Sequence, residues 1–269
     1  MTIFTMHGVT EEKNRKFVHR NLMDARKFSH ILRSRELFVS VADALASKGD
    51  ALTIDDSTRA GLLAAKIAVE YGHKVTLYVN PEQIINQVPY PFCRLNVLLD
   101  QIVSPVHFYN KNYDVSERCL LRKEIKSQLL KIKYTKDQHD FLDELFFLFD
   151  IQLTKVPEHL YPPTLKELQN ISEQGVTIGN HGWSHMPHDV FTLEESLKEI
   201  QYTSRWISEN LTYYDIQTFA VPNGEFYPQS DNRKYFSVIW LLADSSIPIG
   251  QIEERVVNRE SLYAHYKNS

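Results

Sequence analysis

Short apolar runs alternate along this chain with longer segments of helical periodicity, and no other feature of the sequence constrains the fold as strongly. Strands are expected at the apolar runs 3–6, 51–54, 74–79, 176–178 and 218–221. Helices are expected at about 58–71, 165–174 and 193–210. This alternation predicts an α/β fold with a largely parallel sheet. Residues 237–243 are predicted as a further strand, with a helix as the open alternative.

One segment departs from this alternation. Residues 91–157 are rich in Leu, Phe, Lys and Asp at helical spacing and follow the strand at 74–79. We expect a helical insertion here, which either caps the sheet or forms a lid. No linker-like stretch separates it from the rest. The 269 residues are therefore predicted to form a single domain, 1–269, with an insertion at about 91–157.

Charge and targeting signals narrow the function classes. The formal net charge of −4 supplies no basic field for nucleic acid, and two cysteines are too few for a disulfide framework. The first residues do not pair a charged segment with a long apolar one, so we expect no secretory signal. No apolar run approaches the roughly 18 residues that a transmembrane helix needs. We expect a soluble cytoplasmic protein, and the sequence leaves its oligomeric state open.

Polar residues follow the carboxyl ends of four predicted strands. In an α/β barrel these ends meet at one face, where active sites are built. The residues expected to converge there are His7, Asp55, Asp56, His181, His185, Pro222 and Asn223.

The segment His181-Gly-Trp-Ser-His185 carries two histidines four residues apart. If it is helical, both rings lie on one face and can bind one metal ion. With Asp56 they form a two-histidine, one-carboxylate set that suits Zn²⁺, with Co²⁺, Ni²⁺ or Mn²⁺ as alternatives. The other interpretation is that both histidines only cap or pack in a loop. His188 fits the spacing less well and is interpreted as a surface or supporting residue.

Asp55 and Asp56 are adjacent and have two interpretations. They could favour the start of the following helix through its dipole. Alternatively, because neighbouring residues at a strand end point in different directions, one could bind metal while the other contacts water.

Three motifs, in order, resemble those of the polysaccharide deacetylases (NodB-type, carbohydrate esterase family 4). Ala-Leu-Thr-Ile-Asp55-Asp56-Ser-Thr resembles the first motif, usually TFDD, and the His181–His185 segment resembles the second. Phe-Ala-Val-Pro222-Asn223-Gly resembles the third. The opening Met-His7-Gly-Val resembles the start of the branch that contains the biofilm poly-N-acetylglucosamine deacetylases.

The resemblance implies a distorted (β/α)7-type barrel and a metal-dependent N-deacetylase acting on an N-acetylated amino sugar. It implies Asp55 as catalytic base and Asp56, His181 and His185 as metal ligands. It also implies that the backbone N–H near Asn223, beside Pro222, helps to hold the oxyanion. His7 matches the general-acid histidine that the biofilm branch places on its first strand, although a histidine that only packs at a strand end is the alternative.

Two positions depart from the family pattern. Ala220 stands where many members have an arginine that orients the base, and Asn223 replaces a tyrosine. Arg255 or Arg259 is expected to supply the missing cation, unless both lie in a solvated surface pair.

Two other functions remain open. One is a deformylase or amidase acting on a small cytoplasmic sugar conjugate, which the expected lack of an export signal favours over an external polymer. The other is a catalytically inactive sugar-binding barrel, against which the intact Asp55, Asp56, His181 and His185 argue.

Overall fold

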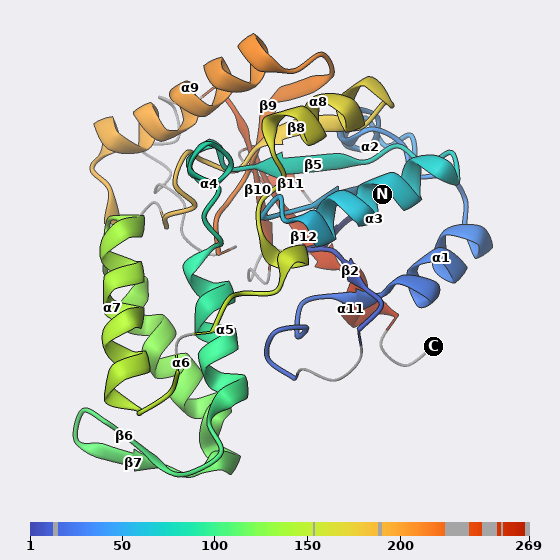
Figure 1. Cartoon of the computed structure of the whole chain (residues 1–269). Coiled ribbons are helices and arrows are strands. Elements are labelled where there is room, and N and C mark those ends of the chain that lie inside the picture. Colours follow the sequence, from blue (N-terminus) through green and yellow to red (C-terminus); the bar gives the residue numbers. More distant parts are fainter. Residues whose placement is uncertain are drawn as a thin grey trace.

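The computed structural model of the chain describes residues 1–12, 16–152, 154–187, 190–223, 237–243, 252–253 and 255–266. Figure 1 shows strands that surround a common axis, with helices on the outside. Seven of these strands form a parallel sheet in the order β1-β4-β5-β8-β9-β10-β12, and β12 pairs back to β1, so the sheet closes into a barrel. The predicted barrel fold is thus confirmed. The bounds are β1 Ile3–Met6, β4 Ala51–Ile54, β5 Thr76–Val79, β8 Thr177–Asn180, β9 Tyr214–Ala220, β10 Ile239–Ala243 and β12 Val256–Ser261.

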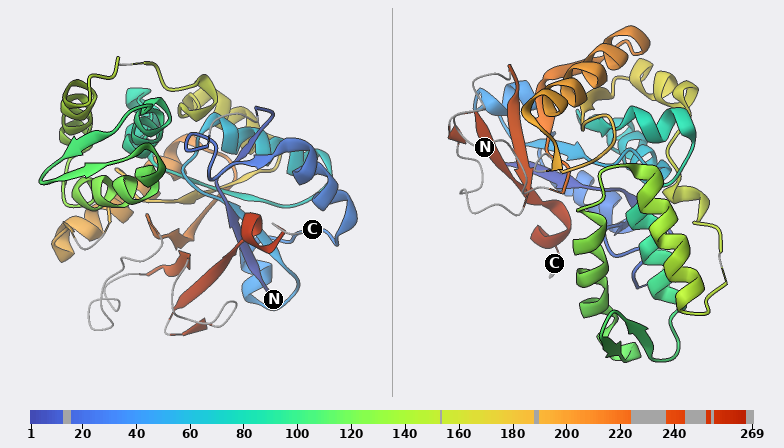
Figure 2. Two further views of the ribbon diagram at one scale, coloured as in Figure 1. Left: turned by 90° about the horizontal axis from the view of Figure 1, so that it is seen from below. Right: turned by 90° about the vertical axis from the view of Figure 1, so that its left-hand side faces the viewer.

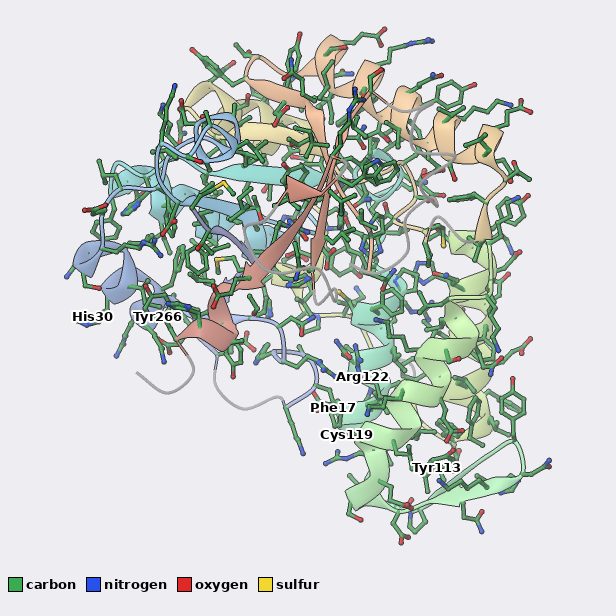
Figure 3. All side chains as sticks on the ribbon, turned by 180° about the vertical axis from the view of Figure 1, so that it is seen from behind. Phe17, His30, Tyr113, Cys119, Arg122 and Tyr266 are labelled. Carbon is green, nitrogen blue, oxygen red and sulfur yellow. The ribbon has the colours of Figure 1, made fainter. Side chains whose placement is uncertain are left out.

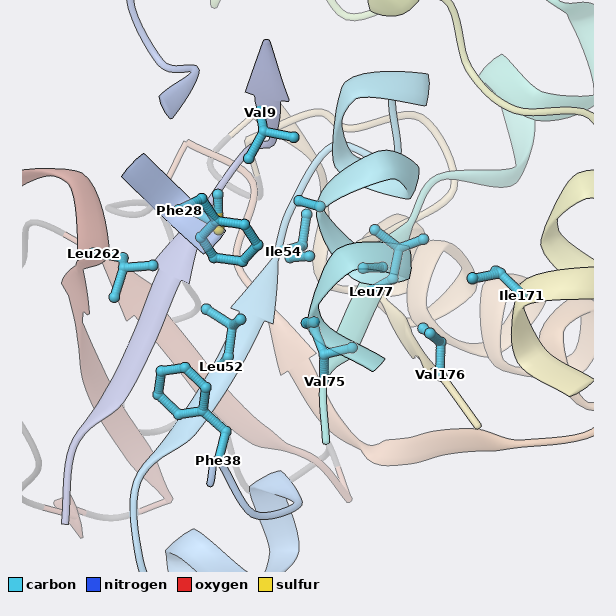
Figure 4. Packing of buried hydrophobic residues seen from close by; sticks show 14 of the residues in the cluster. Val9, Phe28, Phe38, Leu52, Ile54, Val75, Leu77, Ile171, Val176 and Leu262 are labelled. Atoms are coloured by element: carbon cyan, nitrogen blue, oxygen red, sulfur yellow. The ribbon is translucent and has the colours of Figure 1, made fainter. Parts of the chain in front are cut away.

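Strands β1, β4 and β5 are buried along their whole length, which is why they read as continuous apolar runs rather than as alternating ones. On β1, Ile3 belongs to the cluster inside the barrel, whereas Phe4 and Met6 belong to the cluster between the barrel and its helices. Side chains that alternate between faces in this way let every second residue of a strand approach the barrel axis. Figure 4 shows the outer cluster, in which Leu52 and Leu77 of neighbouring strands pack with Phe28.

Helices cover the outside of the barrel. They are α1 Ala25–Ser34, α2 Val41–Leu45, α3 Arg59–Glu70, α4 Pro81–Asn86, α8 Leu165–Glu173, α9 Leu193–Asn210 and α11 Leu262–His265. Several begin at a side chain that caps the first backbone N–H groups: Thr58 caps α3, and Thr164 and Thr192 each form a capping box at α8 and α9. The two-residue strands β2 Val9–Thr10 and β3 Met23–Asp24 form a separate small sheet, and β11 Ile252–Glu253 pairs antiparallel with β12.

The structure corrects several expected boundaries. Strand β9 begins four residues before the expected run, and residues 239–243 are strand, so the helical alternative does not hold. Helix α1 and strand β12 were not predicted. Strand β12 was missed because Asn258, Arg259 and Glu260 interrupt its apolar pattern.

Residues 91–157 contain the helices α5 Pro91–Gln101, α6 Arg118–Leu129 and α7 Thr135–Leu148. They also contain a hairpin, β6 Val106–Phe108 and β7 Lys111–Tyr113, which the helical pattern had not suggested, and a 3-10 turn, η1 Val115–Glu117. A second turn, η2 Glu158–Leu160, follows. Figures 1 and 2 show α5, α6 and α7 side by side, projecting away from one end of the barrel. They share a hydrophobic cluster distinct from that of the barrel, built around Leu98, Leu121 and Leu142.

Among the described helices, none combines the length and the apolar character that crossing a membrane requires.

Candidate functional site

A pocket of about 300 Å³ opens where the carboxyl ends of the barrel strands meet helices α5 and α6. Four strand ends that the sequence singles out supply part of its lining, together with Phe92, Arg122 and Lys126 from the helices. The predicted residues that line it are His7, Asp55, Asp56, His181, His185 and Asn223.

Asp56, His181 and His185 present ligand atoms that all lie within 4.8 Å of one another. The Nε2 atoms of His181 and His185 lie 3.2 and 3.0 Å from the same Asp56 oxygen, Oδ1. Both imidazoles are buried, whereas the Asp56 side chain is 26% exposed. Burial raises the pKa of Asp56, but the charges of His185 and His7 outweigh it and hold that pKa well below its ordinary value. The carboxylate is therefore ionised.

The tautomer of His181 follows from its other ring nitrogen. Nδ1 lies 2.7 Å from the Ala220 carbonyl, an acceptor only, so Nδ1 must carry the proton and donate it. The Nε2 atom is therefore the ring nitrogen that faces Asp56 and the pocket, 3.2 Å from Asp56 Oδ1, and it is the atom that would bind a metal ion. A second hydrogen bond that fixes the ring in this way is a usual feature of histidines that bind metals.

The segment that joins the two histidines is a loop and not a helix, so the two rings approach each other without the helical geometry that the spacing argument had assumed as a condition. Gly182 has φ 81° and His185 has φ 62°, so the backbone turns twice through the left-handed region. The side-chain amide of Asn80 donates to the carbonyls of His181 and Gly182. The carboxylate of Glu199, on α9, accepts hydrogen bonds from the N–H groups of Trp183 and Ser184 and from the Ser184 hydroxyl. Two neighbouring elements thus hold the loop.

Asp55 is buried and forms a two-point ion pair with Arg259 of β12. The Nη1 atom of Arg259 donates to Oδ1 at 2.8 Å and Nη2 donates to Oδ2 at 2.7 Å, while Thr5 donates to Oδ2 at 3.3 Å. Burial raises the pKa of Asp55, but the Arg259 charge and its hydrogen bonds outweigh it, so the pKa lies below its ordinary value. Neither Asp55 nor Asp56 caps α3, because Thr58 does.

Arg259 itself is only 2% exposed, and the Arg259 guanidinium also donates to the Leu242 carbonyl and to Thr53. Arg259 is therefore not part of a solvated pair on the surface, which was the alternative interpretation. Arg255 lies directly before β12 and has an exposed side chain. Of the two candidates for the missing cation, Arg259 is the one that reaches Asp55.

His7 lies at the pocket wall, with its Nε2 atom 3.8 Å from Oδ2 of Asp56 and its side chain 36% exposed. Asn223 also lines the pocket, in a left-handed backbone conformation with φ 61°. Pro222 is buried beside the Gly182 turn and is absent from the pocket lining. His188 and Gly224 lie outside the described residues.

Sequence reasoning missed several residues that support the site. The Tyr90 hydroxyl donates to Asn80 at 2.8 Å, and the Tyr90 ring packs edge-on against His185 with 5.1 Å between centroids. Phe92 and Tyr263 give the pocket an aromatic lining, although Asn223 replaces the tyrosine of the family pattern. Asn80 could have been found, because it is a polar residue directly after β5, and the other site residues were singled out by the same position at the end of a strand. Tyr90, Phe92 and Glu199 carry no such signal.

Comparison with known proteins identifies the family. A family model described as polysaccharide deacetylase matches residues 46–235, more than half of the chain. The structure of the Streptococcus pyogenes deacetylase PplD in complex with acetate is similar, with a TM-score of 0.62 and 12% sequence identity over 97% of this chain and 92% of that one. The BpsB deacetylase domain from Bordetella bronchiseptica is similar with a TM-score of 0.52 and 9% identity, covering 97% and 95% of the two chains.

Identities this low establish a shared fold, whereas the family is established by the match over residues 46–235. No curated protein matches the chain significantly. The resemblance carried by the three sequence motifs is confirmed. The chain belongs to the polysaccharide deacetylase family.

Proposed function

We propose that this protein is a metal-dependent N-deacetylase that hydrolyses the acetamide of an N-acetylated amino sugar to a free amine and acetate. One observation carries the proposal. The ligand atoms of Asp56, His181 and His185 converge within 4.8 Å, in a pocket that also holds the ionised, buried Asp55. Membership of a deacetylase family supports the reaction type, and the PplD structure, which holds acetate, has the same fold.

The donor set fits a divalent metal. Two imidazole nitrogens and a carboxylate oxygen are ligands that Zn²⁺ accepts, and Co²⁺, Ni²⁺ or Mn²⁺ accept the same donors. The hydrogen bond from His181 to Ala220 leaves Nε2 as the ligand atom. When bound by these residues, the ion would act as a Lewis acid towards water and the acetamide carbonyl.

The remaining chemistry falls to side chains of the chain itself. Asp55 accepts a proton from the water that attacks the acetamide carbon. Its Oδ1 atom keeps a lone pair beyond its bond to Arg259, whereas Oδ2 accepts from both Arg259 and Thr5. The backbone N–H near Asn223, beside Pro222, donates to the oxygen that gains negative charge. His7 gives a proton to the nitrogen as the carbon–nitrogen bond breaks, because an amine leaves poorly as an anion.

We also propose that residues 1–269 form one domain and that 91–157 is an insertion within it. Phe92 of α5 and Lys126 of α6 line the same pocket as the strand-end residues, which supports this division. An insertion that supplies part of the pocket wall would help to select the substrate.

The function is tested by measuring acetate and formate release from a panel of N-acetylated and N-formylated sugars, oligosaccharides and sugar nucleotides, with and without added Zn²⁺. We expect acetate release that requires about one divalent ion per chain. Release of formate alone would instead identify a deformylase. No release from any member of the panel by the metal-loaded protein contradicts the proposal and favours a sugar-binding barrel.

Two variants assign the roles. Asp55→Asn keeps the shape of the side chain but cannot take the proton, so metal content should persist while activity falls at least about a hundredfold. The double variant His181→Ala/His185→Ala should lose metal and activity together. Stoichiometric metal in the double variant contradicts the ligand assignment, and a loss of metal in Asp55→Asn would make Asp55 a ligand.

A further inference from the structure

The wall of the pocket opposite the strand ends is cationic. Among the described residues, the pocket lining contains Arg20, Arg122, Lys126 and Arg259 but only two carboxylates, Asp55 and Asp56. Arg259 is committed to Asp55. The other three cations come from the loop at 16–22 and from α6. This concentration of positive charge contrasts with the net charge of −4 of the whole chain.

Arg122 is the clearest sign that an anion belongs here. The side chain is 9% exposed, and the Arg122 Nε atom donates to the Asn96 amide oxygen at 2.9 Å. No described residue forms a hydrogen bond or an ion pair with the two terminal nitrogens of Arg122. Burial, together with repulsion from Arg20, lowers the pKa of Arg122 to about 10. Buried arginines without a carboxylate partner are rare, because desolvation of the charge is costly unless an anion compensates it.

Arg20 is the second cation and is held close to Arg122. Its side chain is exposed and forms no ion pair with any described residue. The carboxylate of Asp100, on α5, accepts hydrogen bonds at 3.0 Å from the N–H groups of Phe17 and Val18, which fixes the loop that carries Arg20 to the helices. Figure 3 shows Arg122 on α6 beside this loop, near Phe17. Two guanidinium groups are thus held near each other at the pocket although they repel.

We propose that the substrate is an anionic amino sugar, whose phosphate or carboxylate is bound by Arg20 and Arg122 while its acetamide lies at Asp55 and Asp56. The fork of a guanidinium binds both kinds of oxyanion at two points. A pocket of about 300 Å³ is at the small end for ligand sites. The anion must therefore be carried by the sugar that bears the acetamide or by the linkage next to it. This inference rests on the proposed deacetylase function and names its substrate class.

The experiment compares three probes: N-acetylglucosamine 1-phosphate, N-acetylmuramic acid and the neutral methyl glycoside of N-acetylglucosamine. Binding to the whole chain is measured by calorimetry, and acetate release is measured with metal added. We expect at least one anionic probe to bind about tenfold more tightly than the neutral one, with a matching advantage in kcat/KM. Whether the phosphate or the carboxylate is preferred distinguishes the two sources of the anion.

Arg20→Gln and Arg122→Gln should each reduce that preference by at least about fivefold, and about 0.5 M NaCl should weaken it in the wild type. The exposed Arg20 keeps the test decisive if Arg122→Gln does not fold. Lys123→Gln removes a positive charge from the exposed face of α6 and is the matched control, for which the preference should be unchanged.

Equal affinity for charged and neutral probes, or no binding of either anion, overturns the inference. A preference unaffected by Arg20→Gln and Arg122→Gln also overturns it. These results leave the proposed function intact if acetate is still released. Anion binding that depends on both arginines, without acetate release from any probe or from the wider panel, would overturn the deacetylase and retain the anion site.

Discussion

At the scale of single residues, the proposed base depends on a guanidinium from the other end of the chain. Asp55 and Arg259 are 204 residues apart in sequence, and both are buried. An ionised carboxylate in such a place is stable only while its partner remains, and removing one member of a buried pair typically costs about 3–5 kcal/mol. The pair also fixes the plane of the carboxylate, so that the remaining lone pair of Oδ1 keeps one direction.

Arg259→Lys separates the charge of Arg259 from its geometry. An ammonium group preserves the positive charge but cannot form two parallel hydrogen bonds to one carboxylate. We expect kcat to fall by about tenfold to a hundredfold with metal content unchanged, because Asp55 remains ionised but is less well oriented. Arg255→Lys, at the exposed position directly before β12, is the control and should behave as wild type. Wild-type kcat in Arg259→Lys would show that orientation by Arg259 is unimportant.

His7 is the proposed acid, and its variant should discriminate between leaving groups. His7→Ala should keep its metal and fold, and should lose most turnover of amide substrates because the amine then leaves without a proton. Activated aryl esters, whose leaving groups need no proton, should be spared. The measurement is the ratio of amide to aryl-ester turnover in variant and wild type. If both rates fall equally, or neither falls, His7 is not the general acid.

At the scale of elements, the proposed metal site depends on a loop that two other elements hold in place. Asn80 follows β5 and Glu199 lies on α9, and both bind the backbone of residues 181–184. Burial raises the pKa of Glu199, and the hydrogen bonds from the loop oppose that rise. A left-handed turn at His185 carries a cost in backbone strain that these contacts offset.

Glu199→Gln tests the contribution of this support. The three hydrogen bonds from the loop all go to one oxygen, Oε2, and a neutral amide oxygen in its place accepts them more weakly than a carboxylate does. We expect Zn²⁺ affinity to fall by about tenfold to a hundredfold, the usual scale for residues that orient metal ligands. Competition with a chromogenic chelator measures the affinity. Glu194→Gln, on the exposed face of the same helix, is the control, and equal affinity in both variants would rule out the role of Glu199.

At the scale of the whole molecule, one buried histidine outside the pocket should make stability depend on pH. The Nδ1 atom of His73 accepts the Phe38 N–H at 3.0 Å, and Nε2 lies 3.0 Å from the Leu32 carbonyl, so the ring must be neutral. Burial lowers the pKa of His73 below its ordinary value near 6.5. The unfolded chain therefore binds a proton, as pH falls below about 6.5, before the folded protein does.

The contribution of His73 to the free energy of unfolding should accordingly be largest above about pH 6.5 and should decrease as the pH falls towards the lowered pKa of His73. His73→Asn keeps an acceptor near the Nδ1 position and cannot titrate, so its stability should change less between pH 7.5 and 5.5, measured by urea denaturation at both pH values. The variant itself should lose about 1–3 kcal/mol at pH 7.5, because the Leu32 carbonyl loses its donor. If the free energy of unfolding changes between pH 7.5 and 5.5 by the same amount in His73→Asn as in the wild type, His73 is excluded as a source of the pH dependence.

The sequence by itself was sufficient for features that depend on local pattern. Apolar runs predicted β1 and β4 with the observed bounds, and helical periodicity did the same for α9, because a strand or an amphipathic helix is recorded in consecutive residues. The order of Asp55-Asp56, His181–His185 and Pro222-Asn223 pointed to the family. Their convergence in one pocket was predictable, except for Pro222, because parallel barrel strands end at one face.

Only the tertiary structure decided which distant residues complete the site. Arg259 lies in a strand whose polar residues hid it, and barrel closure through the β1–β12 pairing brings it to Asp55. Arg20 and Arg122 lie in segments with no pattern that links them, and a net charge of −4 gave no indication of a cationic pocket. Local patterns report the environment of one element, whereas an ion pair between residues far apart in the chain depends on how the elements pack.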